Sequence, residues 1–367
     1  MVVALAGVVA GCDASTPMRG KVGVAATSTS SAATTAASTA VPASTITPSA
    51  PRAIESPATP VAVIDGRYRL VTRTGNDLVE TSSDGTARVV ATLADVTTTV
   101  TPTLSGMADR LLVTYGGHTV VYDTRVWGDP IGASDHYNVG TIATATGFWA
   151  GRVDAPADGQ PTVTWQRRDW RGVPFGPSFN GPWSSALPFG AITDGLVLWR
   201  MDDAHIFVLA NGAVHDVGAG HPIATGGNQI AYQPRDGAVT VFDAATGRVR
   251  VLDRLDGRAP AQTLGAGAFA PDGHALALAT SDASPPYASH GVVVYDLDAR
   301  SSSGAAAVSR RRFDTIAAYA VTWTPDSSHV IASDHTGIAS IDPVTGDATY
   351  PVRWNDDETF DVVVLTG

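Results

Sequence analysis

The sequence has one cysteine, Cys12, and one lysine, Lys21, among 367 residues. A single cysteine excludes a disulfide framework within the chain. Acidic residues outnumber basic ones by 35 to 24, so the formal net charge is −11 and no basic stripe exists to neutralise nucleic-acid phosphates. We therefore expect no nucleic-acid partner, and any attachment to a membrane must come from something other than adsorption to anionic headgroups.

Long apolar runs are also missing. Residues 2–11 form a short apolar run that cannot cross a bilayer as a helix but has the length typical of a signal segment. It ends Val9-Ala10-Gly11-Cys12, and small residues directly before a cysteine resemble the lipobox of bacterial lipoproteins. That resemblance implies cleavage before Cys12 and acylation of its thiol and new amino group, for example with palmitate. No Lys or Arg precedes the run, so an ordinary secretory signal and a chance apolar terminus remain as alternatives.

Residues 13–60 consist mostly of Ser, Thr, Ala and Pro and contain almost no large apolar side chains. Such a segment cannot offset its ordering entropy by burial. We predict a signal segment over 1–12, a disordered tether over 13–60 and a folded domain over 61–367, which together give an extracytoplasmic protein anchored to the bacterial cell membrane.

After residue 60, short runs of β-branched and aromatic residues alternate with Gly, Asp and Asn, and long helix-period patterns are absent; this favours an all-β fold. The clearest unit occurs twice, over 268–282 and 321–334. Each copy has an aromatic-ended strand, a Pro-Asp turn and a second apolar strand, and a third strand follows that ends in Asp296 or Asp342. The aromatic residues recur after 323 − 269 = 54 residues, a spacing that β-propeller blades tolerate.

Five further units of similar rhythm precede these two. The first, over 66–93, lacks an inner strand, and residues 361–365 form a last strand with no blade of its own. Pairing the two would close the ring and remove an open sheet edge. The sequence therefore predicts an all-β, seven-bladed β-propeller closed by its C-terminal strand.

The segments Phe269-Ala-Pro-Asp272-Gly and Trp323-Thr-Pro-Asp326-Ser are similar to the core of TolB-type and related WD-like propeller repeats. The resemblance implies the propeller fold and structural roles for these four residues: the aromatic ring packs between sheets and the Asp closes a turn. It says little about function, because propellers include binding scaffolds as well as lyases and lactonases.

No fixed-spacing metal motif, nucleophile elbow or phosphate-binding loop is present. His329, Asp334 and His335 form the densest set of metal-ligating types, but they straddle a short strand, and we interpret Asp202-Asp203 as a turn. We expect no metal and no cofactor, and we assign no catalytic residue.

Aromatic residues crowd the third and fourth units. Trp149, Trp165 and Trp199 fall within predicted strands and are expected to pack between blades. A Gly/Pro-rich connection over 169–188 carries four more, which we interpret as anchors for a partner or, alternatively, as a loop packed onto its own blade. These four residues are Trp170, Phe175, Phe179 and Trp183.

Arg310, Arg311 and Arg312 end an insertion over 298–312 and form the only dense positive run. They fit either a carboxylate on a partner or a solvated loop.

The sequence thus favours a monomeric, non-catalytic scaffold that binds an envelope protein or glycan. The alternative is a propeller hydrolase or lyase that acts on an envelope or sugar-derived substrate.

Overall fold

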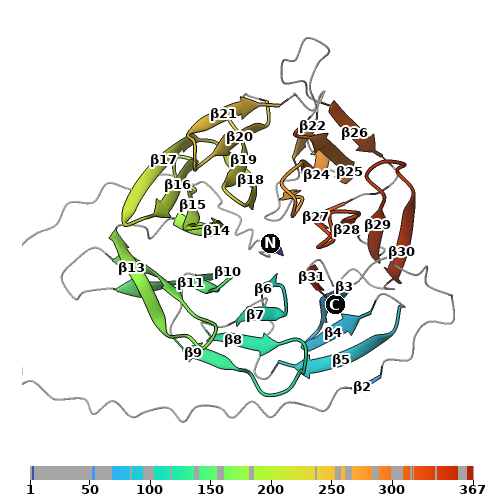
Figure 1. Ribbon diagram of the computed structural model, residues 1–367, viewed down its shortest axis with the longest axis horizontal. Helices are drawn as coiled ribbons and strands as arrows, with labels where there is room; N and C mark the ends of the chain where they lie inside the picture. The colour runs from blue at the N-terminus through green and yellow to red at the C-terminus, as the bar shows by residue number, and fades with distance from the viewer. Residues whose placement is uncertain are drawn as a thin grey trace, which may run out of the picture.

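The computed structural model describes residues 2–3, 52–53, 68–82, 85–93, 103–115, 118–135, 140–154, 161–181, 186–235, 238–252, 258–260, 267–282, 289–298, 309–314, 316, 318–334, 337–353 and 362–366. These residues form seven antiparallel sheets that stand as blades around a central axis (Figure 1). The described part of the chain contains strands and turns but no helix, and hence no helix capable of crossing a membrane. The seven-bladed propeller predicted from the sequence is confirmed.

Blades are numbered in chain order, and the strands of each blade are named from the inner edge to the outer edge. Blade 1 is β31 (Val362–Thr366), β3 (Tyr68–Thr74), β4 (Asp77–Thr81), β5 (Ala87–Thr92) and β2 (Arg52–Ala53). Blade 2 is β1 (Val2–Val3), β6 (Thr103–Met107), β7 (Arg110–Tyr115), β8 (His118–Asp123) and β9 (Gly132–Asp135). Blade 3 is β10 (Gly140–Thr144), β11 (Gly147–Asp154), β12 (Thr162–Arg168) and β13 (Pro174–Gly181). Blade 4 is β14 (Ala186–Ile192), β15 (Gly195–Arg200), β16 (His205–Ala210) and β17 (Ala213–Ala219).

The remaining three blades follow the same plan. Blade 5 is β18 (His221–Gly226), β19 (Gln229–Gln233), β20 (Thr240–Asp243) and β21 (Arg248–Val251). Blade 6 has β22 (Arg258–Pro260) and β23 (Gly267–Phe269) side by side with β24 (Ala275–Asp282), then β25 (Ser289–Asp296) and β26 (Ser309–Phe313). Blade 7 is β27 (Ala320–Trp323), β28 (Val330–Asp334), β29 (Gly337–Ile341) and β30 (Ala348–Arg353).

The two ends of the ring meet in blade 1. The C-terminal strand β31 pairs antiparallel with β3, in a register that places Thr72 opposite Val362 and Tyr68 opposite Thr366. This confirms that the last strand completes the first blade, so the inner edge of blade 1 is not left open.

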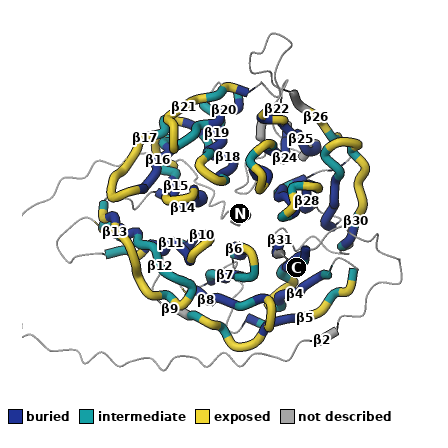
Figure 2. The backbone as a smooth tube through the Cα atoms, in the orientation of Figure 1, coloured by how far each residue is buried: buried dark blue, intermediate teal, exposed yellow. Residues whose placement is uncertain are grey.

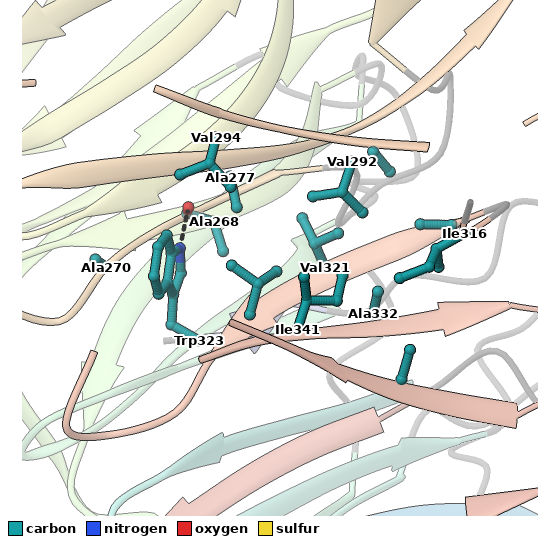
Figure 3. Close-up of a cluster of buried hydrophobic side chains, with 14 residues drawn as sticks. Ala268, Ala270, Ala277, Val292, Val294, Ile316, Val321, Trp323, Ala332 and Ile341 are labelled. Carbon is teal, nitrogen blue, oxygen red and sulfur yellow. Dashed lines mark hydrogen bonds between the residues drawn. The ribbon is translucent and has the colours of Figure 1, made fainter. Parts of the chain in front are cut away.

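Hydrophobic side chains pack between neighbouring blades. The described residues contain seven buried clusters, one for each boundary between adjacent blades. In the cluster between blades 6 and 7, Trp323 points toward Ala268 and Val294 (Figure 3). Colouring by burial shows buried residues within the blades, while the outer strands β13 and β17 are largely exposed (Figure 2).

An aspartate at or just after the end of the third strand closes the turn to the outer strand in five blades. Its Oδ1 accepts a hydrogen bond from the backbone N–H two residues later, a turn that Asp favours. These residues are Asp123, Asp169, Asp243, Asp296 and Asp342, with distances of 3.1, 2.9, 2.9, 2.9 and 2.6 Å. The repeated Asp in the sequence is thus a turn residue.

Candidate functional site

The aromatic connection after blade 3 is more regular than its sequence predicts. Residues Pro174–Gly181 form β13, the outer strand of blade 3, which corrects the expectation of a loop across this range. Its pairing with β12 shifts register between Gln166 and Arg167, and Gly176 adopts φ +73° nearby, a conformation that glycine takes without strain. An outer strand needs hydrogen bonds along one edge only, so its Gly and Pro residues are tolerated.

Two of the four candidate anchor residues pack inward. Phe179 is buried, and its ring centroid lies 5.9 Å from that of Trp149, in the cluster between blades 3 and 4. Trp170 packs on the cluster between blades 2 and 3, with its ring 6.5 Å from Phe148. Phe179 therefore contributes to the core, and Trp170 supports a blade boundary.

Phe175 is partly exposed to solvent. Its side chain is 37% exposed, and the Arg167 guanidinium lies 5.0 Å from its ring centroid, within cation–π range. Trp183 follows β13 and lies outside the described residues. Among the three candidates that the structure describes, Phe175 is the exposed one.

The three tryptophans expected between blades occupy those positions. Trp149 and Trp165 are buried between blades 3 and 4, and Trp199 packs on the cluster between blades 4 and 5. Their contribution is packing.

The arginine run lies on a strand, which corrects its assignment to an insertion loop. Arg310, Arg311 and Arg312 belong to β26, the outer strand of blade 6. Arg311 Nη1 donates to the Pro343 carbonyl in blade 7 over 2.9 Å, and Arg312 Nε donates to Asp314 over 2.8 Å. The side chains of Arg311 and Arg312 therefore follow the alternation of a strand.

The residues of the two repeat motifs have structural roles. Phe269 and Trp323 are buried between blades, and Trp323 Nε1 donates to the Ala268 carbonyl over 3.0 Å. Asp272 Oδ1 accepts the His274 N–H over 2.9 Å, and Asp326 Oδ1 accepts the Ser328 N–H over 3.1 Å.

Of the residues considered for metals, His329 and Asp203 have hydrogen-bond partners close by in the chain. His329 Nδ1 lies 2.9 Å from Ser328 Oγ, and Asp203 accepts bonds from Arg200. His335, like Cys12, lies outside the described residues. Within the described part of the chain, no group of three His, Cys, Asp or Glu residues is placed to hold a metal ion.

A charged and aromatic cluster lies on blade 4. Arg200 binds Asp203 through both Nε and Nη2, at 2.8 and 2.5 Å, and its guanidinium lies 4.8 Å from the Phe207 ring centroid. His205 stacks on Phe207 and lies between two carboxylates, with Nδ1 3.5 Å from Asp203 and Nε2 3.6 Å from Asp216. The hydrogen bond from Arg200 lowers the pKa of Asp203 to about 2, so this carboxylate is ionised at neutral pH.

A second charged group is buried between blades 1 and 2. Glu80 is 2% exposed and accepts hydrogen bonds from Arg69 at 2.9 Å, from Arg88 at 2.9 and 3.2 Å, and from Trp127 Nε1 at 2.6 Å. Arg69 also donates to the Thr124 carbonyl over 2.6 Å. Donors surround the carboxylate, which gives it a structural role as a link between blades.

Exposed apolar side chains on the outer strands of three consecutive blades were not predicted from the sequence. They are Phe175 on β13, Val214 on β17, and Val249 and Val251 on β21, exposed by 37, 47, 58 and 61%. We call these four residues the rim surface. The alternating Arg-Val-Arg-Val sequence of β21 was the available signal, because an apolar residue at every second position predicts one apolar strand face.

Comparisons with known proteins support the fold alone. No family model matches the sequence, and no curated protein is similar to it. A functionally unknown protein from Desulfotomaculum acetoxidans DSM 771 has a solved structure that matches with a TM-score of 0.55 and 12% identity, over 82% of this chain and 99% of that one.

Two further structures are similar at the same level. A chain in the structure of the Mitotic Checkpoint Complex matches with a TM-score of 0.51 and 12% identity, over 91% of this chain and 99% of that one. Oligogalacturonate lyase in complex with manganese matches with a TM-score of 0.50 and 13% identity, over 78% and 85%. At such low identity, the shared feature is the propeller fold.

Proposed function

We propose that this chain is an extracytoplasmic β-propeller scaffold of the TolB-like, WD-like type. In this proposal the chain is cleaved before Cys12, so blade 2 of the mature protein keeps β6 to β9 without β1. The lipidated Cys12 holds the protein at the bacterial cell membrane, and the rim surface binds an envelope protein or glycan. The proposal takes its anchor from the lipobox-like sequence and its binding role from the exposed side chains of Phe175, Val214, Val249 and Val251.

The rim surface is the observation that carries the binding role. Single exposed apolar residues are ordinary on protein surfaces, whereas contiguous apolar patches mark interaction sites. Val249 and Val251 are neighbours on one face of β21. The aromatic member, Phe175, is fixed by the Arg167 guanidinium 5.0 Å from its ring centroid, so less conformational freedom is lost when a partner binds it.

Two arginines of blades 3 and 4 already have acidic partners within the ring. Arg200 is bound to Asp203, and Arg167 lies 3.9 Å from Asp194 in blade 4. On these two blades a partner would therefore gain mainly from apolar and backbone contacts, which suits a scaffold.

Photo-cross-linking in intact membranes tests the binding role. A photoreactive amino acid replaces Val214 or Val249 in the full-length chain, and the matched control carries it at Val344, which is 68% exposed on blade 7. We expect a discrete protein or glycan adduct from the two rim positions and none from the control. Equal labelling at all three positions, or no adduct at any of them, would reject rim binding.

Two further measurements separate the other parts of the proposal. Cys12→Ser should remove metabolic labelling with palmitate and release the protein from the membrane fraction; continued labelling would reject the anchor. If the captured ligand is a glycan, incubating it with the purified chain separates scaffold from enzyme. An unchanged glycan supports a scaffold, whereas shortened products would favour a hydrolase or lyase.

A further inference from the structure

Basic and apolar residues alternate along the outer strand of blade 5. Strand β21 reads Arg-Val-Arg-Val over Arg248–Val251 and is the last strand of its sheet among the described residues. It contains no Gly or Pro, and its pairing with β20 shows no register shift. The outer strands β13, β17 and β30 each join their sheet through a shift, whereas β9 and β26, like β21, do not. Such irregularities protect edges against pairing with another chain, and β21 lacks them.

The backbone pattern shows which groups of β21 point away from the blade. Leu252 N–H donates to the Val239 carbonyl over 2.8 Å, and Gly247 N–H donates to Asp243 over 2.8 Å. Because inward and outward groups alternate along an antiparallel strand, Arg248 and Arg250 bond inward to β20. Val249 and Val251 therefore direct their N–H and C=O groups outward, where they can pair with an added strand.

The apolar side chains of β21 lie on the face toward blade 4. Val249 is directly opposite Phe242 on β20, and Phe242 packs on the cluster between blades 4 and 5. Residues directly opposite on an antiparallel pair share a face. Val249 and Val251, 58 and 61% exposed, thus extend that buried cluster onto the surface.

The basic side chains lie on the other face, toward blade 6. Arg250 Nη1 donates to the Leu297 carbonyl of blade 6. Arg248 is two positions earlier on the strand, so its side chain lies on the same face, and it is exposed. From the facing blade, Arg312 is opposite Val293, which packs in the cluster between blades 5 and 6. Arg248 and Arg250 thus line this side of β21, where Asp243 of β20 lies directly opposite Arg248.

From this arrangement we infer that the edge of β21 accepts an extended segment of a partner protein in which apolar and acidic residues alternate. The segment adds antiparallel as a fifth strand of blade 5 and bonds to the outward groups of Val249 and Val251. Its apolar side chains cover the two valines, and its carboxylates lie on the side of Arg248. Blade 1 provides a precedent, because β2 pairs antiparallel with its outer strand β5.

The inference rests on the proposed function and narrows its partner to an extended acidic and apolar peptide. The probe is a fluorescent peptide, acetyl-Ser-Val-Glu-Val-Glu-Ser-amide, titrated into the full-length chain and followed by anisotropy. A peptide with Lys at both Glu positions is the charge control, and one N-methylated at both Val positions is the hydrogen-bond control. We expect binding of the Glu peptide and at least tenfold weaker binding of both controls. Equal binding of all three peptides, or binding of none, would overturn the inference.

Variants of the protein locate the site. Val249→Pro removes one outward N–H but keeps every inward bond of β21, so binding should weaken about fivefold, whereas Val249→Thr should bind as the parent does. Arg248→Glu should reverse the preference between the Glu and Lys peptides. Parent-like binding by Val249→Pro, or an unchanged preference in Arg248→Glu, would contradict the assignment.

The two proposals fail in distinguishable ways. If no peptide binds but a photoreactive residue at Val214 captures a partner, the strand-addition inference falls and the binding scaffold stands. If that position captures nothing either, both fall.

Discussion

The indole Nε1–H of Trp127, in blade 2, donates a hydrogen bond to Glu80 of blade 1 over 2.6 Å. Arg69 and Arg88 form ion pairs with the same carboxylate, each through a guanidinium nitrogen 2.9 Å from a Glu80 oxygen. Trp127 adopts φ +35°, which is rare for a bulky residue. Trp127 thus has an unfavourable backbone conformation, and its indole lies within hydrogen-bond distance of the buried Glu80 carboxylate.

Replacing this carboxylate should destabilise the ring. Glu80→Gln keeps the volume but leaves the Arg69 guanidinium without a charged partner in a buried site, so we expect the free energy of unfolding to fall by about 3 kcal/mol. Urea unfolding measures it. Asp194→Asn is the control, because Asp194 is 71% exposed and 3.9 Å from Arg167 and should change stability by less than about 0.5 kcal/mol. Equal effects would show that the Glu80 network adds no stability.

Close packing at the ring closure gives a second prediction. A Cβ at Gly106 would overlap Cγ1 of Val363 on the closing strand. Gly106→Ala should therefore cost about 2 kcal/mol of unfolding free energy, and Gly106→Ala with Val363→Ala should cost less than the sum of the two single changes. Gly128→Ala is the control, since no atom lies within 4 Å of its Cβ position. Additive effects in the double variant would refute contact between blade 2 and the closing strand.

The inner and middle strands could be predicted because burial leaves a repeated apolar pattern in their sequence. Trp323 and the turn at Asp342 recur at blade spacing, and the apolar run that became β31 had no other blade to join. Outer strands lack this signal. In β13, five consecutive residues are exposed, and Arg311 and Arg312 on β26 are exposed on both faces, so neither strand shows an apolar residue at every second position.

The candidate site was less predictable, because it depends on which blades become neighbours. Trp127 and Glu80 are 47 positions apart, and no local motif links them. Phe175 was one of the candidate contact residues, but the other members of the rim surface come from separate blades. For Phe179 a partner contact and packing onto its own blade both stayed open, because its burial depends on Trp149, two strands away in the same blade.

The hydrogen bond of Trp323 gives a third prediction. Its Nε1 donates to Ala268 over 3.0 Å between blades 6 and 7, whereas the buried Nε1 of Trp165 has no hydrogen-bond partner in the described structure. Trp→Phe removes similar volume at both sites, but Trp323→Phe also removes a buried hydrogen bond. Trp323→Phe should lower the unfolding free energy by about 1–2 kcal/mol more than Trp165→Phe. A larger loss at Trp165, measured by urea unfolding, would contradict this reasoning.

The turn aspartate of blade 2 predicts a loss of stability in acid. Hydrogen bonds from the Arg125 side chain, with smaller contributions from its backbone N–H and from Arg110, lower the pKa of Asp123 from its ordinary 3.8 to about 2. As pH falls the unfolded chain takes up this proton first, so the stabilisation is complete above about pH 4 and is lost as the pH falls to about 2. Asp123→Asn removes the titration, so parent and variant should differ most at pH 5 and converge by pH 2 in urea unfolding. The convergence should weaken in high salt, because Arg125 and Asp123 are partly exposed, and a difference that stays constant from pH 5 to 2 would show that this carboxylate is not held ionised by its arginines.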